Sequence, residues 1–471
     1  MLKTGWDLPN TSENLNEIMR KNILIPLAGI LSIVSCSEKQ KLQKPNIIML
    51  LVDDLGWKDV GFMGSKFYKT PNIDKLSEKS MVFTNAYAAC SVCSPTRASI
   101  QTGRYPARIG ITDWIRARFQ IPGGILIEPP PYQENGNQKL RTPSNPYWMN
   151  QDEITIAEQL KKSGYFTCHI GKWHLGPDEF YPEKQGYDIN IGGCDLGQPV
   201  NYFDPYSNEE GVHFPTLKPR KTGEYLEDRL ADELVHVVDL HKDEPFFINM
   251  CFYAVHLPLM AKKEIVDKYE AESTHDDQNN PVYAAMIESV DQAVGKLIAT
   301  LEKYDLIDNT IIIFFSDNGG LLRSTSNKPL RAGKGYPYEG GIREPMFVFW
   351  KDKIQSGSVC ETPVSSIDFF PTFCSISGTP LPDKILDGMD ISPLFFKKTI
   401  KPRALFWHYP HYRSTDIVPY SIIRDGNLKL IRRYERKEFE LFNLANDLGE
   451  TEDLSETYPL LVDSLKFKLE N

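Results

Sequence analysis

The stretch Asn46-Ile47-Ile48-Met49-Leu50-Leu51-Val52-Asp53-Asp54 is a continuous apolar run that ends abruptly in two carboxylates. Such a run, without polar alternation, is typical of a strand buried on both faces of a parallel sheet. Similar runs occupy residues 165–170, 246–253 and 310–315. Charged or imidazole residues follow each of them, in the segments 171–176, 256–258 and 316–319. Since ligands bind beyond the carboxyl ends of strands in open α/β sheets, the pattern predicts one site at this edge.

Helix patterns separate these strands. Thr155 and Glu158 have the spacing of a capping box, which begins a helix that Gly164 can end. Apolar residues recur every three or four positions over residues 287–301, which predicts an amphipathic helix. The polar passage 103–149 predicts a large surface loop beside the site.

Two domains follow from these patterns. We expect a catalytic α/β domain of residues 45–385, built on a large mixed, mostly parallel sheet that is flanked by helices. After residue 385 the helix–strand alternation stops, and strand candidates surround the turn Asp425-Gly426-Asn427. A helix pattern follows at residues 460–469. We expect residues 386–471 to form a smaller subdomain with an antiparallel sheet and a helix.

The composition limits the class of partner. The 471 residues are 25% charged and 41% hydrophobic, which is ordinary for a globular protein. The net charge is −10 and no basic stripe is present, which argues against nucleic acid as a partner. An anionic substrate would therefore be attracted by a local cationic pocket and not by the overall field.

Residues 1–44 have the pattern of a leader and a polar tether. Met19-Arg20-Lys21 is a basic start, and the apolar run 23–34 is too short to span a bilayer. The run ends in Ile33-Val34-Ser35-Cys36, which resembles a bacterial lipobox. We therefore expect export to the cell envelope of a Gram-negative bacterium, in the periplasm or at the outer membrane, with a lipid anchor at Cys36 as the only membrane contact. The alternative is an ordinary signal peptide that ends near a cysteine.

The motif Cys93-Ser94-Pro95-Thr96-Arg97, completed by Thr102-Gly103-Arg104, points to the chemistry. A lone cysteine is most often a small buried hydrophobic residue. This spacing, however, resembles the signature of type I sulfatases of the alkaline-phosphatase-like superfamily, which implies oxidation of Cys93 to formylglycine by a maturation enzyme. A hydrated aldehyde offers two hydroxyls on one carbon, one to attack sulfur and one to expel sulfate afterwards.

Oxygen ligands at two strand ends predict a hard metal ion. Asp53, Asp54, Asp317 and Asn318 suit Ca²⁺ or Mg²⁺ and not Zn²⁺. Either pair alone would fit a helix cap or a turn. The resemblance identifies these four, together with modified Cys93, as the metal site of the family, and it favours one Ca²⁺ over Mg²⁺.

The resemblance also assigns the remaining site residues. Lys172 and His174 lie in one matching motif, His256 in a second and Lys334 in a third. It implies that Arg97, Lys172 and Lys334 neutralise sulfate oxygens, that His256 protonates the departing sugar oxygen, and that His174 takes the proton of the hydrate.

The expected activity is hydrolysis of sulfate esters, most specifically exo-acting desulfation of galactose or N-acetylgalactosamine glycans. The aromatic and histidine-rich stretch 406–412 is a candidate sugar subsite, and an apolar seam between the two domains is the alternative. Two rival functions stay open. One is a phosphoester or phosphonate hydrolase of the same superfamily, and the other is an inactive glycan-binding lipoprotein.

Six further cysteines could form disulfides in an exported protein, in pairings that the sequence does not define. They are Cys90, Cys168, Cys194, Cys251, Cys360 and Cys374. We expect Cys168 and Cys251 to lie in the core, and Cys90 to take no part in the chemistry.

Overall fold

A computed structural model describes residues 44–134, 136, 138–275, 277–436 and 438–471. The predicted leader, its lipobox and Cys36 lie outside the described residues. Within the described ranges, no helix combines the length and the apolar character needed to cross a membrane.

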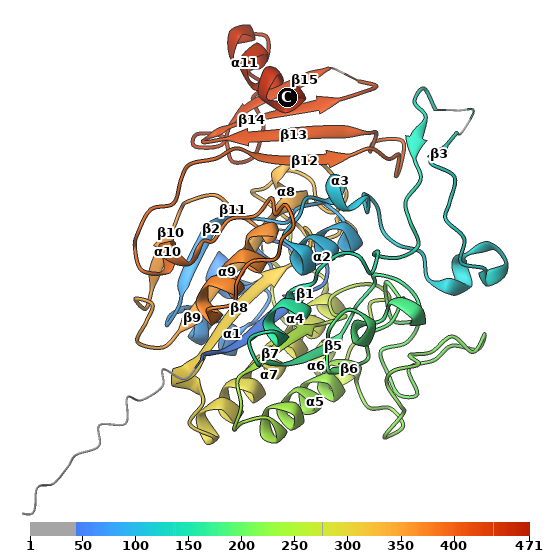
Figure 1. Cartoon of the computed structure of the whole chain (residues 1–471), viewed down its shortest axis with the longest axis vertical. Coiled ribbons are helices and arrows are strands. Elements are labelled where there is room, and N and C mark those ends of the chain that lie inside the picture. The colour runs from blue at the N-terminus through green and yellow to red at the C-terminus, as the bar shows by residue number, and fades with distance from the viewer. Residues whose placement is uncertain (1–43, 135, 137, 276, 437) are drawn as a thin grey trace, which may run out of the picture. The chain divides into compact units, whose positions relative to one another are not determined.

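A nine-stranded sheet forms the centre of the catalytic region (Figure 1). Its order is β10-β2-β9-β8-β1-β7-β5-β6, and β11 also pairs with β2. The strands are β1 Asn46–Val52, β2 Met81–Tyr87, β5 Phe166–Gly171, β6 Ile189–Ile191, β7 Phe246–Cys251, β8 Thr310–Ser316, β9 Arg343–Trp350, β10 Ser358–Cys360 and β11 Val364–Ser365. β1 is parallel to β7 and β8, whereas β9 is antiparallel to both of its neighbours. The prediction of a mixed, mostly parallel sheet is confirmed.

Helices cover both faces of this sheet, because successive β1 side chains point to opposite sides. Ile48 and Leu50 pack into one core with residues of α5 and α7, and Met49 and Leu51 pack into a second core with residues of α2, α4 and α9. The helices are α1 Pro71–Ser77, α2 Cys93–Thr102, α3 Pro106–Ile109, α4 Ile156–Lys161, α5 Leu226–Leu240, α6 Lys263–Glu270, α7 Pro281–Lys303, α8 Glu339–Ile342, α9 Phe369–Ser377, α10 Ser392–Phe395 and α11 Pro459–Glu470. Short 3-10 turns lie at Gly61–Met63, Arg118–Gln120, Pro122–Gly124, Asp178–Phe180, Pro182–Lys184, Ile307–Asn309 and Ser366–Asp368.

The four strands expected from apolar runs are all present, with ends shifted by one or two residues. The capping box of α4 is formed as predicted: Thr155 Oγ1 accepts from Glu158 N at 3.2 Å, and Glu158 Oε2 accepts from Thr155 N at 2.8 Å. The passage 103–149 is not one open loop. It contains α3 and the short pair β3 Tyr132–Gln133 and β4 Thr142–Pro143, and it buries Ile115.

A four-stranded antiparallel sheet follows at the C-terminal end, as predicted, and lies at the top of Figure 1. Its strands are β12 Leu405–Tyr409, β13 Tyr420–Asp425, β14 Leu428–Arg433 and β15 Phe439–Asn443. α11 packs on this sheet through Val462 and Leu465. The boundary expected at residue 386 stays a prediction.

A buried ion cluster joins this sheet to the catalytic region. Lys429 Nζ of β14 lies 2.9 Å from Glu339 Oε1 of α8 and 2.8 Å from Glu450 Oε1, and all three side chains are fully buried. Glu339 also accepts from the Tyr87 hydroxyl at 2.6 Å. Because α8 follows the segment that carries Lys334, this cluster fixes one wall of the predicted site.

We expect Lys429→Ala to destabilise the protein by about 3–5 kcal/mol, because buried Glu450 loses its cation and buried Glu339 loses one of its two ion pairs, keeping that with Arg343. The measurement is the urea midpoint of the unfolding transition that reports the C-terminal sheet. Lys468→Ala is the matched control, because it removes a lysine from an exposed pair with Asp425 and should cost less than about 1 kcal/mol. Equal shifts for the two variants would contradict the structural role of the cluster.

Candidate active site

The predicted site residues converge at the carboxyl edge of the central sheet. They come from five places: after β1 (Asp53, Asp54), after β5 (Lys172, His174), after β7 (His256), after β8 (Asp317, Asn318, Lys334) and from the first turns of α2 (Cys93, Arg97). The expectation that four strand ends form one site is confirmed by the contacts described below.

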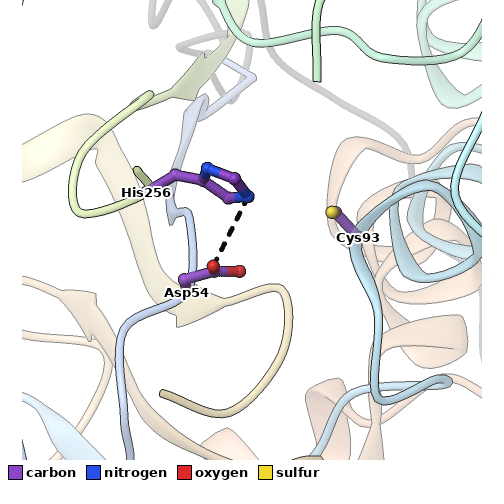
Figure 2. Close-up of side chains that lie close together, drawn as sticks. All are labelled: Asp54, Cys93 and His256. Carbon is purple, nitrogen blue, oxygen red and sulfur yellow. Dashed lines mark ion pairs between the residues drawn. The ribbon is translucent and has the colours of Figure 1, made fainter. Parts of the chain in front are cut away.

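Cys93 is the first residue of α2, which points the start of a ten-residue helix into the site. Its side chain faces Asp54 and His256 from the opposite side (Figure 2). Cys93 Sγ lies 3.7 Å from Lys334 Nζ, and Cys93 is only 3% exposed. A helix N-terminus and an ammonium group both favour an anion at this position.

Four buried oxygen-bearing side chains lie around one point. Asp53, Asp317 and Asn318 are fully buried, and Asp54 is 2% exposed. Asp54 N donates to Asp317 Oδ1 at 3.2 Å, which ties the two strand ends together. Donor atoms of Asp53, Cys93 and Asp317 all lie within 4.8 Å of one another, as do those of Asp54, Cys93 and His256.

The site has the unmet bonding capacity that a cation requires. Three buried oxygens have no hydrogen-bond partner within the described chain: Asp53 Oδ1, Asp54 Oδ2 and Asn318 Oδ1. Burial raises the pKa of Asp53 to about 8, in spite of Lys172 beside it. A hard divalent ion would satisfy these oxygens and offset the burial of the carboxylates. The residues present therefore fit a Ca²⁺ or Mg²⁺ ion.

Two of the predicted sulfate-binding cations have a different position from the one expected. Arg97 Nε donates to Asp317 Oδ2 at 2.8 Å, and Lys172 Nζ donates to Asp53 Oδ2 at 2.7 Å. Neither side chain lines the pocket, and both are buried behind the carboxylates. Their charge is needed there, because buried carboxylates without cations are strongly unfavourable. Lys334, in contrast, lines the pocket, and its Nζ lies 2.5 Å from Asp54 Oδ1.

The two imidazoles have defined hydrogen bonds. His174 Nε2 lies 2.7 Å from the Ile115 carbonyl oxygen, so Nε2 carries the proton and the partnerless Nδ1 has a free lone pair. Burial and Lys172 hold the pKa of His174 well below its usual range, which keeps the ring neutral. His256 Nδ1 lies 3.0 Å from the Leu257 carbonyl oxygen, and its Nε2 lies 3.5 Å from Asp54 Oδ2. Burial, followed by Lys334, lowers the pKa of His256 to about 3.

A pocket of about 310 Å³ opens above these groups. Its wall includes residues that the sequence did not identify: Trp114, Phe119, Gln120, Gln198, Arg323 and Arg413. Phe119 is 58% exposed, and with Trp114 it presents an aromatic surface of the kind that sugar rings contact. Nothing in the sequence distinguishes Trp114 and Phe119 from the other aromatic residues of the passage 103–149, so this surface could not be found from the sequence.

The stretch 406–412 is not part of the pocket wall. Trp407 and Tyr409 are buried in a core with Tyr87 and Tyr420, and His411 Nε2 lies 2.7 Å from Thr112 Oγ1. Aromatic and histidine side chains are suited to a core as well as to a sugar subsite. Because Trp407 and Tyr409 are buried, the stretch 406–412 forms an apolar seam and not a sugar subsite. The next residue, Arg413, is the one that lines the pocket.

The cysteines of the described residues are all buried and free. Cys168 and Cys251 lie in the core, as predicted. Cys90 does not line the pocket, and burial raises the pKa of its thiol to about 12. A neutral buried thiol is inert, in agreement with the expectation that it takes no part in the chemistry.

Comparison with known proteins agrees with this geometry. The sequence model of the sulfatase family matches residues 45–379, and that of the N-sulphoglucosamine sulphohydrolase C-terminal region matches residues 333–471. The chain is 32% identical to a sulfatase of Formosa agariphila over 93% of this chain and 90% of that protein. The chain belongs to the sulfatase family. This sulfatase is therefore a sulfuric ester hydrolase, and the rival phosphoester or phosphonate hydrolase is not favoured.

Two further likenesses concern named sulfatases. Human N-acetylgalactosamine-6-sulfatase is 30% identical over 78% of this chain and 68% of its own length. The crystal structure of Ps i-CgsB has a TM-score of 0.77 and 33% identity, and the match covers 91% of this chain and 92% of that one. The fold of this sulfatase is thus the alkaline-phosphatase-like fold expected from the sequence.

Proposed function

We propose that this sulfatase hydrolyses sulfate monoesters of galactose or N-acetylgalactosamine glycans in an exo-acting manner, with formylglycine at position 93 and one bound Ca²⁺. The observation that supports the proposal most directly is that Cys93, Lys334 and Asp54, whose Oδ2 has no hydrogen-bond partner within the described chain, line one small pocket. Formylglycine would supply the nucleophilic hydroxyl and Ca²⁺ would supply a Lewis acid for a sulfate oxygen. Asp53, Asp54, Asp317 and Asn318 would hold the ion with residue 93.

The residues of this chain then divide the work. Lys334 lies on the pocket wall beside Cys93, so it binds the sulfate oxygens directly. Arg97 and Lys172 act as positioning residues, since they hold the carboxylates of Asp317 and Asp53. His174 lines the pocket and its Nδ1 has a free lone pair, so this ring is the proposed acceptor of a proton from the hydroxyl of residue 93.

His256 is the proposed donor to the departing sugar oxygen. Its side chain lines the pocket, and Figure 2 shows its Nε2 toward Asp54, with Cys93 on the opposite side. The low pKa of the ring means that the neutral form dominates before substrate binds. A bound sulfate anion favours the protonated form of His256, so substrate binding raises the pKa of the ring and favours its role as the acid.

The glycan class is inferred from the relatives and from the pocket. N-acetylgalactosamine-6-sulfatase carries its sugar in its name, and Ps i-CgsB has been crystallised with k-i-k-neocarrahexaose. In this chain a pocket of about 310 Å³ with an aromatic wall suits one terminal sugar better than an internal segment of a polymer. We further propose export to the bacterial cell envelope with a lipid anchor at Cys36, for which the sequence pattern of residues 19–36 is the support.

Two measurements test the proposed function together. Mass analysis of the tryptic peptide that contains residue 93 should show an aldehyde in place of the thiol. Sulfate release should then be measured on galactose and N-acetylgalactosamine carrying one sulfate at the 2-, 3-, 4- or 6-position, and on intact sulfated polymer. Activity on one terminal sugar sulfate is expected. Release from internal positions of the polymer alone would overturn the exo-acting assignment, and an unmodified thiol without turnover would favour an inactive glycan-binding protein.

His256→Ala should affect sugar sulfates far more than aryl sulfates. A sugar alkoxide needs a proton in order to leave, whereas a phenolate leaves unaided, so we expect a loss of about 100-fold or more in kcat for the sugar sulfate. The measurement is the ratio of kcat values for a sugar sulfate and 4-nitrocatechol sulfate. Equal losses on the two substrates would show that His256 binds substrate without transferring a proton.

A further inference from the structure

Two arginines line the outer part of the pocket, apart from the proposed sulfate-binding groups. Arg323 follows the Asp317-Asn318 segment, and Arg413 lies in the segment after β12. Both residues are exposed, whereas Cys93 and Lys334, which line the same pocket, are buried. The arginines therefore lie nearer to the mouth, where the part of a substrate beyond the scissile sulfate would be.

Neither of these two arginines has a close acidic partner among the described residues. Within the described chain, neither guanidinium has an ion pair or a side-chain hydrogen bond. The cations at the inner end, in contrast, are paired: Lys334 with Asp54, and Arg97 with Asp317. Among the described residues that line the pocket, Asp54 is the only acid. The mouth thus has an excess of positive charge on a protein whose net charge is −10.

The fold holds Arg413 close to the proposed sulfate site. Arg413 N donates to the Ile417 carbonyl oxygen at 3.0 Å, which turns the segment back on itself. Its side chain crosses Gly335, the neighbour of Lys334, so closely that a Cβ there would lie 3.0 Å from Arg413 Cδ. Gly335 also has a φ of 88°, a conformation in which glycine is strongly preferred. The positive charges of Arg413 and Lys334 are therefore near each other. An anion bound beside both groups would stabilise this arrangement.

We propose that Arg323 and Arg413 bind a second anionic group of the substrate, so that the preferred saccharide carries an anion in addition to the sulfate that is hydrolysed. The inference rests on the proposed function, because it assumes that the scissile sulfate binds beside Cys93 and Lys334. The planar, forked guanidinium fits an oxyanion, and a sulfate ester and a carboxylate both offer the required pair of oxygens. Since Arg413 lies against the residue next to Lys334, the second anion belongs to the same sugar or to the adjoining one.

The test compares substrates that share one scissile sulfate. The first is the monosulfated sugar that the panel above identifies, the second carries an additional sulfate ester, and the third is linked to a uronic acid. The wild-type enzyme should have a kcat/KM at least about tenfold higher for one of the two dianionic substrates than for the monosulfated sugar, mainly through KM. The dianionic substrate with the higher kcat/KM shows whether the second anionic group is a sulfate or a carboxylate.

The variants are Arg323→Gln, Arg413→Gln and the double substitution. Each single change should lower the preference for the dianionic substrate by about three- to tenfold, and the double change should abolish it. Arg116→Gln is the matched control: Arg116 is exposed and close in sequence to Trp114, but it does not line the pocket. This control removes the same charge and should keep the preference. Thermal midpoints of all variants check that the fold is intact.

A binding measurement makes the test independent of turnover. Calorimetry on the Cys93→Ala protein should show tighter binding of the dianionic saccharide than of the monosulfated sugar. The difference should shrink when Arg323→Gln or Arg413→Gln is added and disappear when both are added. A preference that persists in the double variant, or a wild-type protein that binds the monosulfated sugar equally well, would overturn the inference. Failure of the proposed function is a different result, namely the absence of an aldehyde at residue 93 and of sulfate release from any substrate.

Discussion

Cys93→Ala should lower sulfate release by at least about a thousandfold while leaving the fold intact. Loss of a covalent nucleophile removes the reaction path itself, and the remaining binding groups cannot replace it. Cys93 lies at the start of α2, and the substitution to alanine removes only its sulfur atom, which lies 3.7 Å from Lys334 Nζ. The measurements are kcat on the preferred sugar sulfate and the thermal midpoint of unfolding.

Cys90→Ala is the matched control for this substitution. Cys90 is buried to the same extent and lies three residues earlier, but its side chain does not line the pocket. We expect this variant to keep most of the activity and to lose only a little stability from the small cavity. Turnover above a few per cent in Cys93→Ala, or equal losses in the two variants, would end the assignment of residue 93 as the nucleophile.

The inner half of the site could be predicted from the sequence because its signals are local. An apolar run such as 46–52 identifies a buried strand by itself, and the carboxylates that follow it must lie at the carboxyl edge of the sheet. Asp317 and His256 belong to the same site by the same logic, because each follows another apolar run of this kind. The spacing within the α2 segment then gave Cys93 its place at a helix start.

The mouth of the pocket could not be predicted in this way. Arg323 and Arg413 are exposed residues of irregular segments, and exposed arginines follow no periodicity that distinguishes them from an ordinary solvated surface. What distinguishes them is that no carboxylate of the described residues pairs with them, and this depends on three-dimensional packing. The same limit explains the stretch 406–412, where only burial separates a seam from a sugar subsite.

Buried charged residues also made some strands hard to predict from the sequence. β9 begins with Arg343 and Glu344, both buried, so the segment does not read as an apolar strand. Arg343 is tolerated there because its Nε donates to the Thr84 carbonyl oxygen at 2.8 Å. Arg97 and Lys172 are a parallel case: the motif identified them, but only the structure shows that they bind the carboxylates of the site and not its pocket.

The unsatisfied oxygens of Asp53, Asp54 and Asn318 indicate that activity depends on a bound cation. Chelation of the purified enzyme should lower kcat by about a thousandfold, and added Ca²⁺ should restore it. Without a cation, the carboxylates are buried against Lys172, Lys334 and Arg97 alone, and Asp53 takes up a proton below its raised pKa of about 8. Removal of the ion should therefore also lower the thermal midpoint, since ion binding to the native state stabilises it.

Asp317→Asn tests whether binding of the ion depends on the charge of this side chain. The substitution keeps the shape of the side chain but removes the charge that faces both the ion and Arg97, whose Nε lies 2.8 Å from Asp317 Oδ2. We expect elemental analysis to show loss of calcium in parallel with loss of activity. Asp59→Asn is the control: Asp59 is equally buried, but the Tyr283 hydroxyl donates to it at 2.7 Å and it lies outside the cluster, so calcium should be retained. Stoichiometric zinc without calcium in the wild-type enzyme, or full calcium in Asp317→Asn, would contradict the metal assignment.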